Sequence, residues 1–187
     1  MRVTEQLCKT MEPIWAKHGR VYQTWKQEKY RIKHFQKYTA PLFTGMRVLD
    51  IGCNAGLQAL ALDGIVDKYY GLEPDPSFAA QFNETKRLIK GHAKCIQDTN
   101  VSINAVLASY VLYHLSDDQL RDLAANVLPQ CKLVVIYTNT KTRKVRKNSY
   151  DLFNPDNVVA YLISAGFKDI NCQYIRDKSI HISVTTQ

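Results

Sequence analysis

The segment Met46-Arg-Val-Leu-Asp-Ile-Gly-Cys-Asn-Ala-Gly-Leu57 decides the fold. Its apolar first half predicts a short buried strand over residues 47–51. A turn follows that contains three residues with little side-chain bulk, Gly52, Asn54 and Gly56. Residues 57–62 then predict a helix. A strand, a glycine-rich turn and a helix in this order present backbone N–H groups to a bound cofactor. The missing Cβ of the glycines lets a ligand approach the backbone closely.

Two acidic residues near this turn indicate which cofactor it binds. Asp50 lies just before the turn, and the turn matches neither G-x-x-x-x-G-K-[ST] nor G-x-G-x-x-G. A carboxylate there suits a cofactor with a cationic amino-acid end better than a pyrophosphate. Glu73 ends the next apolar run, at about the separation at which an acid binds a ribose hydroxyl in such folds.

These features resemble the class I S-adenosylmethionine (SAM)-dependent methyltransferases. In that family the first acid and the glycines hold the methionine end of SAM, and the acid after the second strand holds the ribose. The resemblance implies SAM as the cofactor and assigns these roles to Asp50, Gly52, Asn54, Gly56 and Glu73. A purely structural strand–helix turn in another α/β protein is the alternative.

Residues after the third and fourth predicted strands complete the candidate site. The third strand is expected over 93–96. The resemblance implies that Asp98 after it, with Gln97 as the second candidate, bonds the adenine amino group, and an exposed Asp in a turn is the alternative. Residues 103–113 predict the fourth strand and the loop beyond it. Ligands bind outside the carboxyl ends of the strands in an open α/β sheet. We therefore expect the polar tail of this segment at the site, with Ser109 toward the cofactor and Tyr110, Tyr113 and His114 toward the acceptor.

The catalytic assignment concerns the tail of the fourth strand. His114 matches the His of the fourth motif of small-molecule methyltransferases, D-x-V-x-x-x-x-x-x-x-H-[LVI], although Asn104 stands where that pattern has Asp. An imidazole titrates near neutral pH, so His114 is the candidate base for an acceptor that keeps its proton. Tyr110 and Tyr113 are candidates to orient an acceptor hydroxyl or amine. A structural role for His114 is the alternative.

The order of the predicted elements gives the fold class. N-terminal helices over 3–17 and 22–38 precede a βαβαβ run, a βαβ run and a final αββ run, whose last two strands are expected over 169–176 and 179–186. This order predicts an α/β protein with a doubly wound, Rossmann-like sheet, mostly parallel with a reversed C-terminal strand. We expect one domain over 1–187, with a helical extension over 1–45 and a SAM-binding core over 46–187.

The formal net charge of +8 is concentrated outside the cofactor core. Residues 1–45 carry +6 and residues 141–147 carry +5. Such clusters suit phosphate-bearing partners, with a solvated face as the alternative. A second resemblance rests on Trp25 in a Lys/Tyr/Arg-rich helix, the Cys53-Asn-Ala-Gly56 turn and Glu73-Pro-Asp. These features are similar to a methyltransferase-like family that includes enzymes modifying the wobble uridine of tRNA. That second resemblance points to an RNA or polar small-molecule acceptor.

Motifs that the chain lacks narrow the chemistry further. It has no N-P-P-Y after the fourth strand, no Pro-Cys pair and no metal-ligand cluster, which argues against exocyclic-amine, pyrimidine-carbon and magnesium-dependent catechol methylation. The prediction is methyl transfer to an O or N atom of an unidentified acceptor, phosphate-bearing such as RNA or a nucleotide. A small-metabolite methyltransferase and a non-catalytic SAM-fold binding subunit are the alternatives.

The cysteines and the apolar runs of the sequence indicate the cellular compartment. Five widely spaced cysteines include no C-x-x-C pair, which predicts reduced thiols and no zinc site. No apolar run approaches the ~18 residues of a membrane span, and the N-terminus lacks a signal-peptide pattern. We expect a cytoplasmic protein that uses neither a metal nor a membrane.

Overall fold

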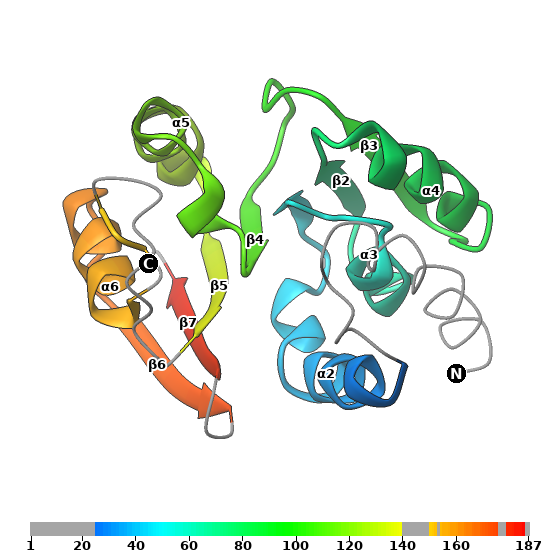
Figure 1. Cartoon of the computed structure of the whole chain (residues 1–187), viewed down its shortest axis with the longest axis horizontal. Coiled ribbons are helices and arrows are strands. Elements are labelled where there is room, and N and C mark those ends of the chain that lie inside the picture. Colours follow the sequence, from blue (N-terminus) through cyan, green and yellow to red (C-terminus); the bar gives the residue numbers. More distant parts are fainter. Residues whose placement is uncertain (1–24, 140–149, 153, 176–178, 186–187) are drawn as a thin grey trace. The chain divides into compact units, whose positions relative to one another are not determined.

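The computed structural model describes residues 25–139, 150–152, 154–175 and 179–185. The helix expected over 3–17 and the basic segment 141–147 lie outside the described residues. The described part of the chain begins with helix α2 (Trp25–Tyr38) and the 3-10 turn η1 (Ala40–Phe43), and η1 leads to the first strand (Figure 1). The second predicted helix therefore ends at Tyr38, as expected.

In the described part of the chain, seven strands form the sheet, in the order β3-β2-β1-β4-β5-β7-β6. Strands β2 and β3, β1 and β4, and β4 and β5 pair in parallel, whereas β7 runs antiparallel to β5 and to β6. The predicted α/β fold, mostly parallel with a reversed C-terminal strand, is thereby confirmed. The strands are β1 (Arg47–Ile51), β2 (Lys68–Leu72), β3 (His92–Ile96), β4 (Ala105–Ser109), β5 (Leu133–Asn139), β6 (Ile170–Ile175) and β7 (Ser179–Thr185).

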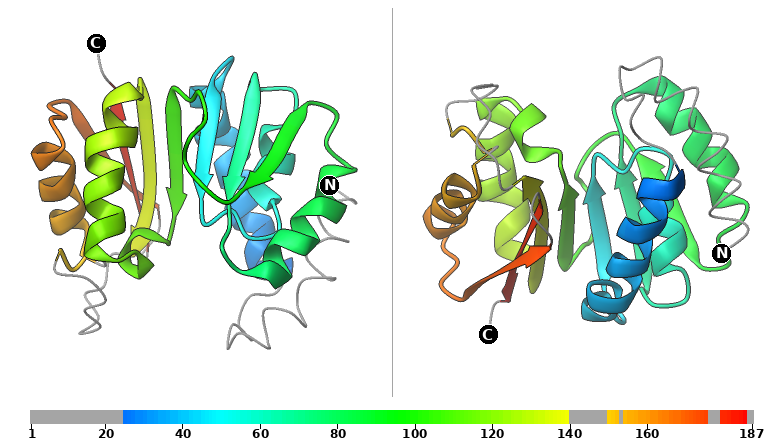
Figure 2. Two further views of the ribbon diagram at one scale, coloured as in Figure 1. Left: turned by 90° about the horizontal axis from the view of Figure 1, so that it is seen from above. Right: turned by 60° about the horizontal axis from the view of Figure 1, so that its bottom comes forward.

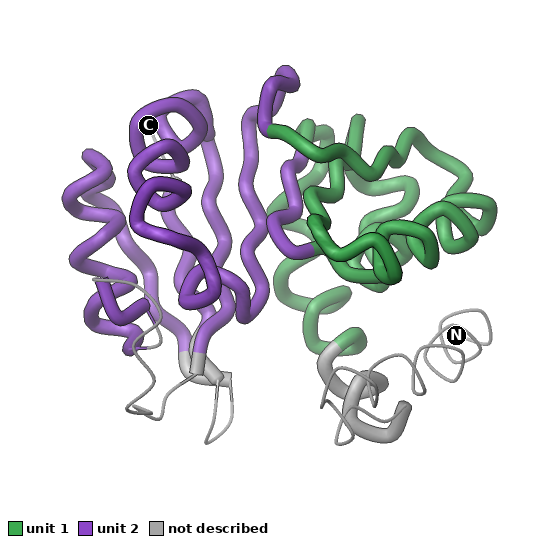
Figure 3. The backbone as a smooth tube through the Cα atoms, turned by 45° about the horizontal axis from the view of Figure 1, so that its top comes forward, with its two compact units in different colours: residues 1–47, 53–98 green, residues 48–52, 99–187 purple. Residues whose placement is uncertain are grey.

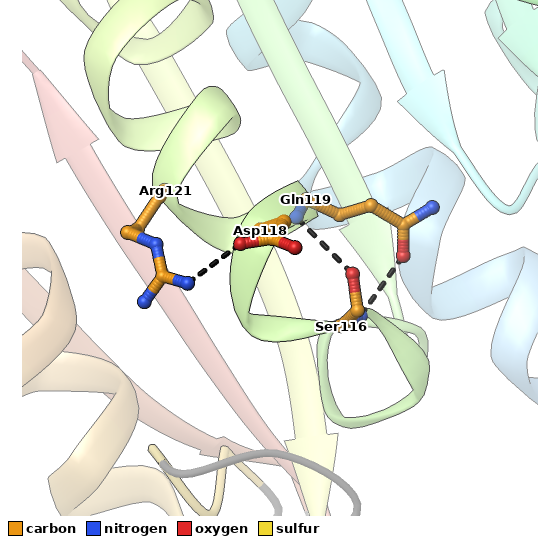
Figure 4. Close-up of polar contacts among 4 residues, drawn as sticks. All are labelled: Ser116, Asp118, Gln119 and Arg121. Carbon is orange, nitrogen blue, oxygen red and sulfur yellow. Dashed lines mark hydrogen bonds and ion pairs between the residues drawn. The ribbon is translucent and has the colours of Figure 1, made fainter.

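Four helices follow the strands, and a side chain caps the N-terminus of the last three. They are α3 (Leu57–Leu62), α4 (Pro76–Lys86), α5 (Asp117–Asp122) and α6 (Pro155–Ser164). At α5, the Ser116 hydroxyl accepts from the Gln119 N–H and the Gln119 side chain accepts from the Ser116 N–H (Figure 4). The helical segment that begins with α5 is not uniform, because α5 continues as a π-helical turn, η3 (Leu123–Val127), and a 3-10 turn, η4 (Leu128–Gln130).

The backbone divides into two compact units (Figure 3). Unit 1 comprises residues 1–47 and 53–98, and unit 2 comprises residues 48–52 and 99–187. The assignment of residues 1–187 to one domain stays a prediction.

Unit 1 is built around two aromatic rings. Tyr69 of β2 and Phe82 of α4 are fully buried, and their rings stack with centroids 6.1 Å apart. The main chain before β1 is tied to the loop before β2, because Gly45 N–H donates to Ile65 O at 2.9 Å and Asp67 N–H donates to Met46 O at 2.9 Å. These contacts fix where β2 begins, and hence where its carboxyl end at Glu73 lies within the unit.

Unit 2 is built on strands that are buried along nearly their whole length. Residues 48–51, 105–108 and 133–138 are all buried, which is the pattern of parallel strands covered on both faces. Helices α5 and α6 lie side by side (Figure 2), and the Tyr161 hydroxyl of α6 donates to Leu120 O of α5 at 2.7 Å. Burial raises the pKa of Tyr161, so this hydroxyl keeps its proton and remains a donor.

Candidate functional site

The turn after β1 is held by hydrogen bonds within unit 1. Cys53 N–H donates to Leu72 O at 3.3 Å, and Gly56 N–H donates to Cys53 O at 3.0 Å. Asn54 and Gly56 both have left-handed backbones, with φ of +53° and +82°. A Cβ on Gly56 would lie 2.8 Å from the ring of Phe82, so α4 packs against the turn where the sequence has no side chain.

Glu73 links this turn to the end of β2. Its carboxylate is 6% exposed, and Oε2 accepts from Asn54 N–H at 3.0 Å while Oε1 accepts from Asp75 N–H at 2.9 Å. A carboxylate has about four lone-pair sites, so both oxygens keep capacity for hydroxyl donors. Asn54 Oδ1 is also buried and has no hydrogen-bond partner among the residues that the structure describes, which is unusual for a buried polar atom. These acceptors fit the hydroxyl-bearing ribose of a cofactor.

A pair of thiols lies beside Glu73. A hydrogen bond from the Cys53 thiol lowers the pKa of Cys95 to about 7, against the opposing effects of burial and of the Glu73 charge. A further hydrogen bond from the Glu73 backbone also favours the Cys95 thiolate. Sequence reasoning identified both residues only as reduced thiols near strands, because nothing in their spacing shows that they meet.

The other half of the predicted glycine motif belongs to unit 2. Asp50 is 1% exposed on β1, opposite Leu107 of β4. Gly52 has a φ of +70°, and a Cβ there would lie 2.6 Å from Cγ2 of Val111. A buried carboxylate at the end of a strand favours a cationic ligand group, because charge-assisted hydrogen bonds are strong. The residues therefore fit the amino-acid end of SAM.

Tyr110 follows β4 directly and has an unusual backbone. Its φ is +58°, a region that bulky residues rarely adopt. Its N–H donates to Tyr137 O at 2.9 Å, and the two rings lie 6.4 Å apart. Tyr137 in turn stacks on His181, with centroids 5.2 Å apart. Strained residues of this kind cluster at functional sites, and the place of Tyr110 at the acceptor stays a prediction.

The remaining acceptor-side candidates lie in the same segment of unit 2. Tyr113 and His114 belong to the 3-10 turn η2 (Leu112–His114), and their rings lie 4.5 Å apart. His114 is exposed, whereas Tyr113 and Ser109 are half-buried. Unit 2 thus brings Ser109, Tyr110, Tyr113 and His114 to the carboxyl end of β4. The neighbouring strand β1 carries Asp50, and Gly52 follows its last residue.

Asp98 is the predicted site residue that follows β3. It lies exposed in the bend after β3, in unit 1. It takes no part in the hydrogen bonds that join Glu73 to Asn54 and Asp75.

Three further residues lie beside the candidate site without having been predicted. Val111 packs over Gly52, while Tyr137 and His181 extend from Tyr110 across β5 and β7. Val111 has no local signal, and the other two come from strands far along the chain. Only the register of β5 on β7, which pairs Tyr137 with His181, reveals them.

Two findings concern other kinds of site. Within the part of the chain that the structure describes, no three His, Cys, Asp or Glu residues are grouped so that they could hold a metal ion. None of the described helices combines the length and the apolar character that crossing a membrane requires.

Comparisons with solved structures agree with the fold. Magnesium protoporphyrin IX methyltransferase from Synechocystis PCC 6803, with bound SAH, is 12% identical over 87% of this chain and 84% of its own, with a TM-score of 0.64. The DhpI–SAH complex is 13% identical over 97% and 96%, with a TM-score of 0.66. A SAM-dependent methyltransferase from Aquifex aeolicus is 13% identical over 83% and 96%, with a TM-score of 0.60.

The family comparison extends this likeness from fold to family. None of the curated proteins matches the chain. A family model described as a methyltransferase domain matches residues 22–183. Because that match spans most of the sequence, the chain belongs to this methyltransferase-domain family, within the class I SAM-dependent methyltransferases.

Proposed function

We propose that this enzyme transfers the methyl group of SAM to an O or N atom of a phosphate-bearing acceptor, such as RNA or a nucleotide. One observation carries the cofactor part of the proposal. Glu73 is a buried carboxylate whose oxygens accept from Asn54 and Asp75 and retain lone pairs for ribose hydroxyls. SAM supplies an activated methyl group, so the chain has to bind the cofactor, align the acceptor and exclude water.

The cofactor residues divide by the part of SAM that they bind. In unit 2, the buried Asp50 carboxylate and the close backbone at Gly52 suit the methionine end, with Ser109 nearby on β4. In unit 1, the turn at Asn54 and Gly56 belongs to the same continuous stretch of chain, Glu73 binds the ribose, and Asp98 is proposed to bond the adenine amino group.

The acceptor residues follow β4. The half-buried Tyr110 and Tyr113 orient the accepting hydroxyl or amine. His114 is exposed, and its imidazole acts as the base that takes a proton from the acceptor. Alignment supplies most of the rate in this proposal, and the base contributes only where the acceptor is protonated.

The charge of the sequence supports the class of acceptor. Residues 1–45 and 141–147 account for more than the whole net charge of +8. Contacts between Lys or Arg and phosphate weaken steeply with salt, because counterions are released on binding. A phosphate-bearing acceptor therefore predicts turnover that falls as ionic strength rises. We also propose that the enzyme acts in the cytoplasm.

The first experiment measures the cofactor. Calorimetry of the full chain should show binding of SAM and of S-adenosylhomocysteine and none of NAD. Asp50→Ala should abolish SAM binding while circular dichroism keeps its native form. Wild-type SAM affinity in this variant would contradict the assignment, and absence of SAM binding to the unmutated protein would favour a non-catalytic subunit.

A second experiment identifies the acceptor class. Methyl-labelled SAM is incubated with RNA, with nucleotides and with a phosphate-free metabolite pool, each at low and high salt. Replacing the basic residues of 141–147 by Gln should lower transfer to RNA or nucleotides, whereas Lys86→Gln with Arg87→Gln, on exposed α4 positions, should not. Transfer only to phosphate-free metabolites, unaffected by salt, would contradict the phosphate-bearing acceptor.

A further inference from the structure

The Cys53 side chain lies over Gly71, the glycine of strand β2. A Cβ on Gly71 of β2 would lie 2.5 Å from the Cys53 sulfur and 3.1 Å from the Cys53 Cβ. Any larger residue at position 71 would therefore displace Cys53. The Cys53 sulfur also lies 3.6 Å from the carbonyl oxygen of Asn54, so the same side chain contacts both the strand and the turn.

The register of the neighbouring strand brings a second thiol to the same place. Gly71 of β2 pairs with Cys95 of β3 in the parallel ladder. Cys53 lies over Gly71, and its thiol hydrogen-bonds to the Cys95 sulfur. Both cysteines are reduced, Cys53 buried and Cys95 half-buried. All of these residues belong to unit 1.

We infer that Cys53 and Cys95 form an oxidisable dithiol, and that closing it to a disulfide loosens the cofactor turn and weakens SAM binding. The statement about SAM rests on the proposed function, whereas the statement about the thiols does not.

The chemistry needs a two-electron oxidant of the peroxide class. The Cys95 thiolate is the nucleophile, because its pKa is lowered to about 7 and it is partly exposed. It attacks hydrogen peroxide, which breaks the O–O bond and gives a sulfenic acid and hydroxide. The Cys53 thiol then attacks the Cys95 sulfur and displaces its oxygen as water. In total, two thiols and one peroxide become one disulfide and two waters.

The consequence for the turn follows from how closely Cys53 is built into it. A disulfide draws two sulfurs from hydrogen-bonding contact to about 2.0 Å. Cys53 must move toward β3, and it is joined directly to Asn54, whose N–H donates to Glu73 at 3.0 Å. Displacing Asn54 removes that hydrogen bond and alters the environment of the proposed ribose acceptor.

The experiment compares three forms of the full chain: the unmutated protein, Cys95→Ser, and Cys172→Ser as a matched control. Cys172 is an exposed cysteine in unit 2 and is not near the turn of unit 1 in the sequence. Each is treated with hydrogen peroxide, mapped by mass spectrometry for linked peptides, and titrated with SAM before and after reduction by dithiothreitol. Amide exchange of a peptide spanning residues 54–56 follows the turn without any ligand.

The expected result has three parts. The unmutated protein and Cys172→Ser form a Cys53–Cys95 link, exchange the amides of 54–56 faster, and lose SAM affinity by about tenfold or more, reversibly. Oxidised Cys95→Ser shows none of these changes, and in its reduced form it binds SAM normally. The Ser hydroxyl can accept the hydrogen bonds that Cys95 accepts.

The outcomes that overturn the inference are separate from those that overturn the function. Absence of the Cys53–Cys95 link, or a link that leaves both amide exchange and SAM affinity unchanged, overturns the inference while reduced protein still binds SAM. Failure of the reduced protein to bind SAM overturns the proposed function, and the peptide map and amide exchange then still decide the behaviour of the dithiol.

Discussion

Asn54 in unit 1 and Tyr110 in unit 2 adopt nearly the same backbone conformation for different reasons. Their φ angles are +53° and +58°, and each residue follows a strand of the sheet closely. Asn tolerates the left-handed region well, and the Asn54 N–H is bonded to the buried Glu73. Tyr has no such tolerance. The comparison teaches that the turn in unit 1 matches its sequence, whereas the strand end in unit 2 retains strain in order to place a ring.

Gly52→Val should give the largest effect, because it removes the backbone conformation on which the cofactor motif depends. A side chain there would face both a φ of +70° and the Val111 side chain at 2.6 Å. We expect SAM affinity to fall by roughly 100-fold or more, measured by calorimetry. Gly64→Val is the matched control, since Gly64 has a φ of +74° and open space around it. Equal loss of SAM affinity in both variants would show that backbone strain alone accounts for the effect.

Glu73→Gln tests the turn of unit 1, in which the Glu73 carboxylate accepts two backbone hydrogen bonds. The amide has one acceptor oxygen, so either Asn54 or Asp75 loses its acceptor. We expect an unfolding free energy lower by about 1–3 kcal/mol and a SAM dissociation constant higher by about tenfold. Asp75→Asn keeps the cap on Ser77 and should leave SAM binding unchanged. A Glu73→Gln protein with native stability and affinity would refute the role assigned to this carboxylate.

Tyr110 tests the strained strand end of unit 2 through a pair of variants. Tyr110→Ala and Tyr110→Gly both remove the ring and should both lower methyl transfer with little change in SAM affinity. The Gly variant should be the more stable by about 1 kcal/mol in denaturant unfolding, because Gly adopts positive φ freely. The same pair at Tyr113, which lacks a positive φ, should show the opposite order of stability. If the Gly and Ala variants had the same order of stability at Tyr110 and at Tyr113, this would argue against strain at Tyr110.

The smallest expected effect is a difference in thiol reactivity between Cys95 of unit 1 and Cys172 of unit 2. A hydrogen bond from the Cys53 thiol lowers the pKa of Cys95 to about 7, whereas burial raises the pKa of Cys172. Iodoacetamide labelling of Cys95 should rise as the pH passes through about 7 and then level off, while labelling of Cys172 keeps rising at higher pH. At neutral pH we expect Cys95 to react roughly fivefold faster or more, because lower thiolate nucleophilicity offsets only part of its larger ionised fraction. Faster labelling of the more exposed Cys172 would contradict this ordering.

The parts of the fold that follow from local sequence were predictable. The bounds of β1, α3 and β2 agree with the apolar runs and the glycine turn of residues 47–72. The reversed final strand followed from the alternating C-terminal segments. These features depend on neighbours in the chain, which a single sequence displays.

What could not be predicted depends on register between distant segments. The thiol pair exists because β3 pairs Cys95 with Gly71, and the ring series from Tyr110 reaches His181 only through β5. The roles of the site residues stay proposals, because neither Asp98 in its exposed bend nor His114 on the surface shows from its position what it binds.

The π-helical turn at residues 123–127 has a consequence for how the length of the chain can vary. Such a turn uses i→i+5 hydrogen bonds and holds more residues than an α-helical turn of the same rise. The Tyr161 hydroxyl binds the carbonyl of Leu120 just before it. We expect that deleting one residue within 123–127 would be absorbed by tightening this turn into an α-helix, leaving the register of β5 intact. Relatives of this protein that differ by one residue here would then keep the same strand pairing.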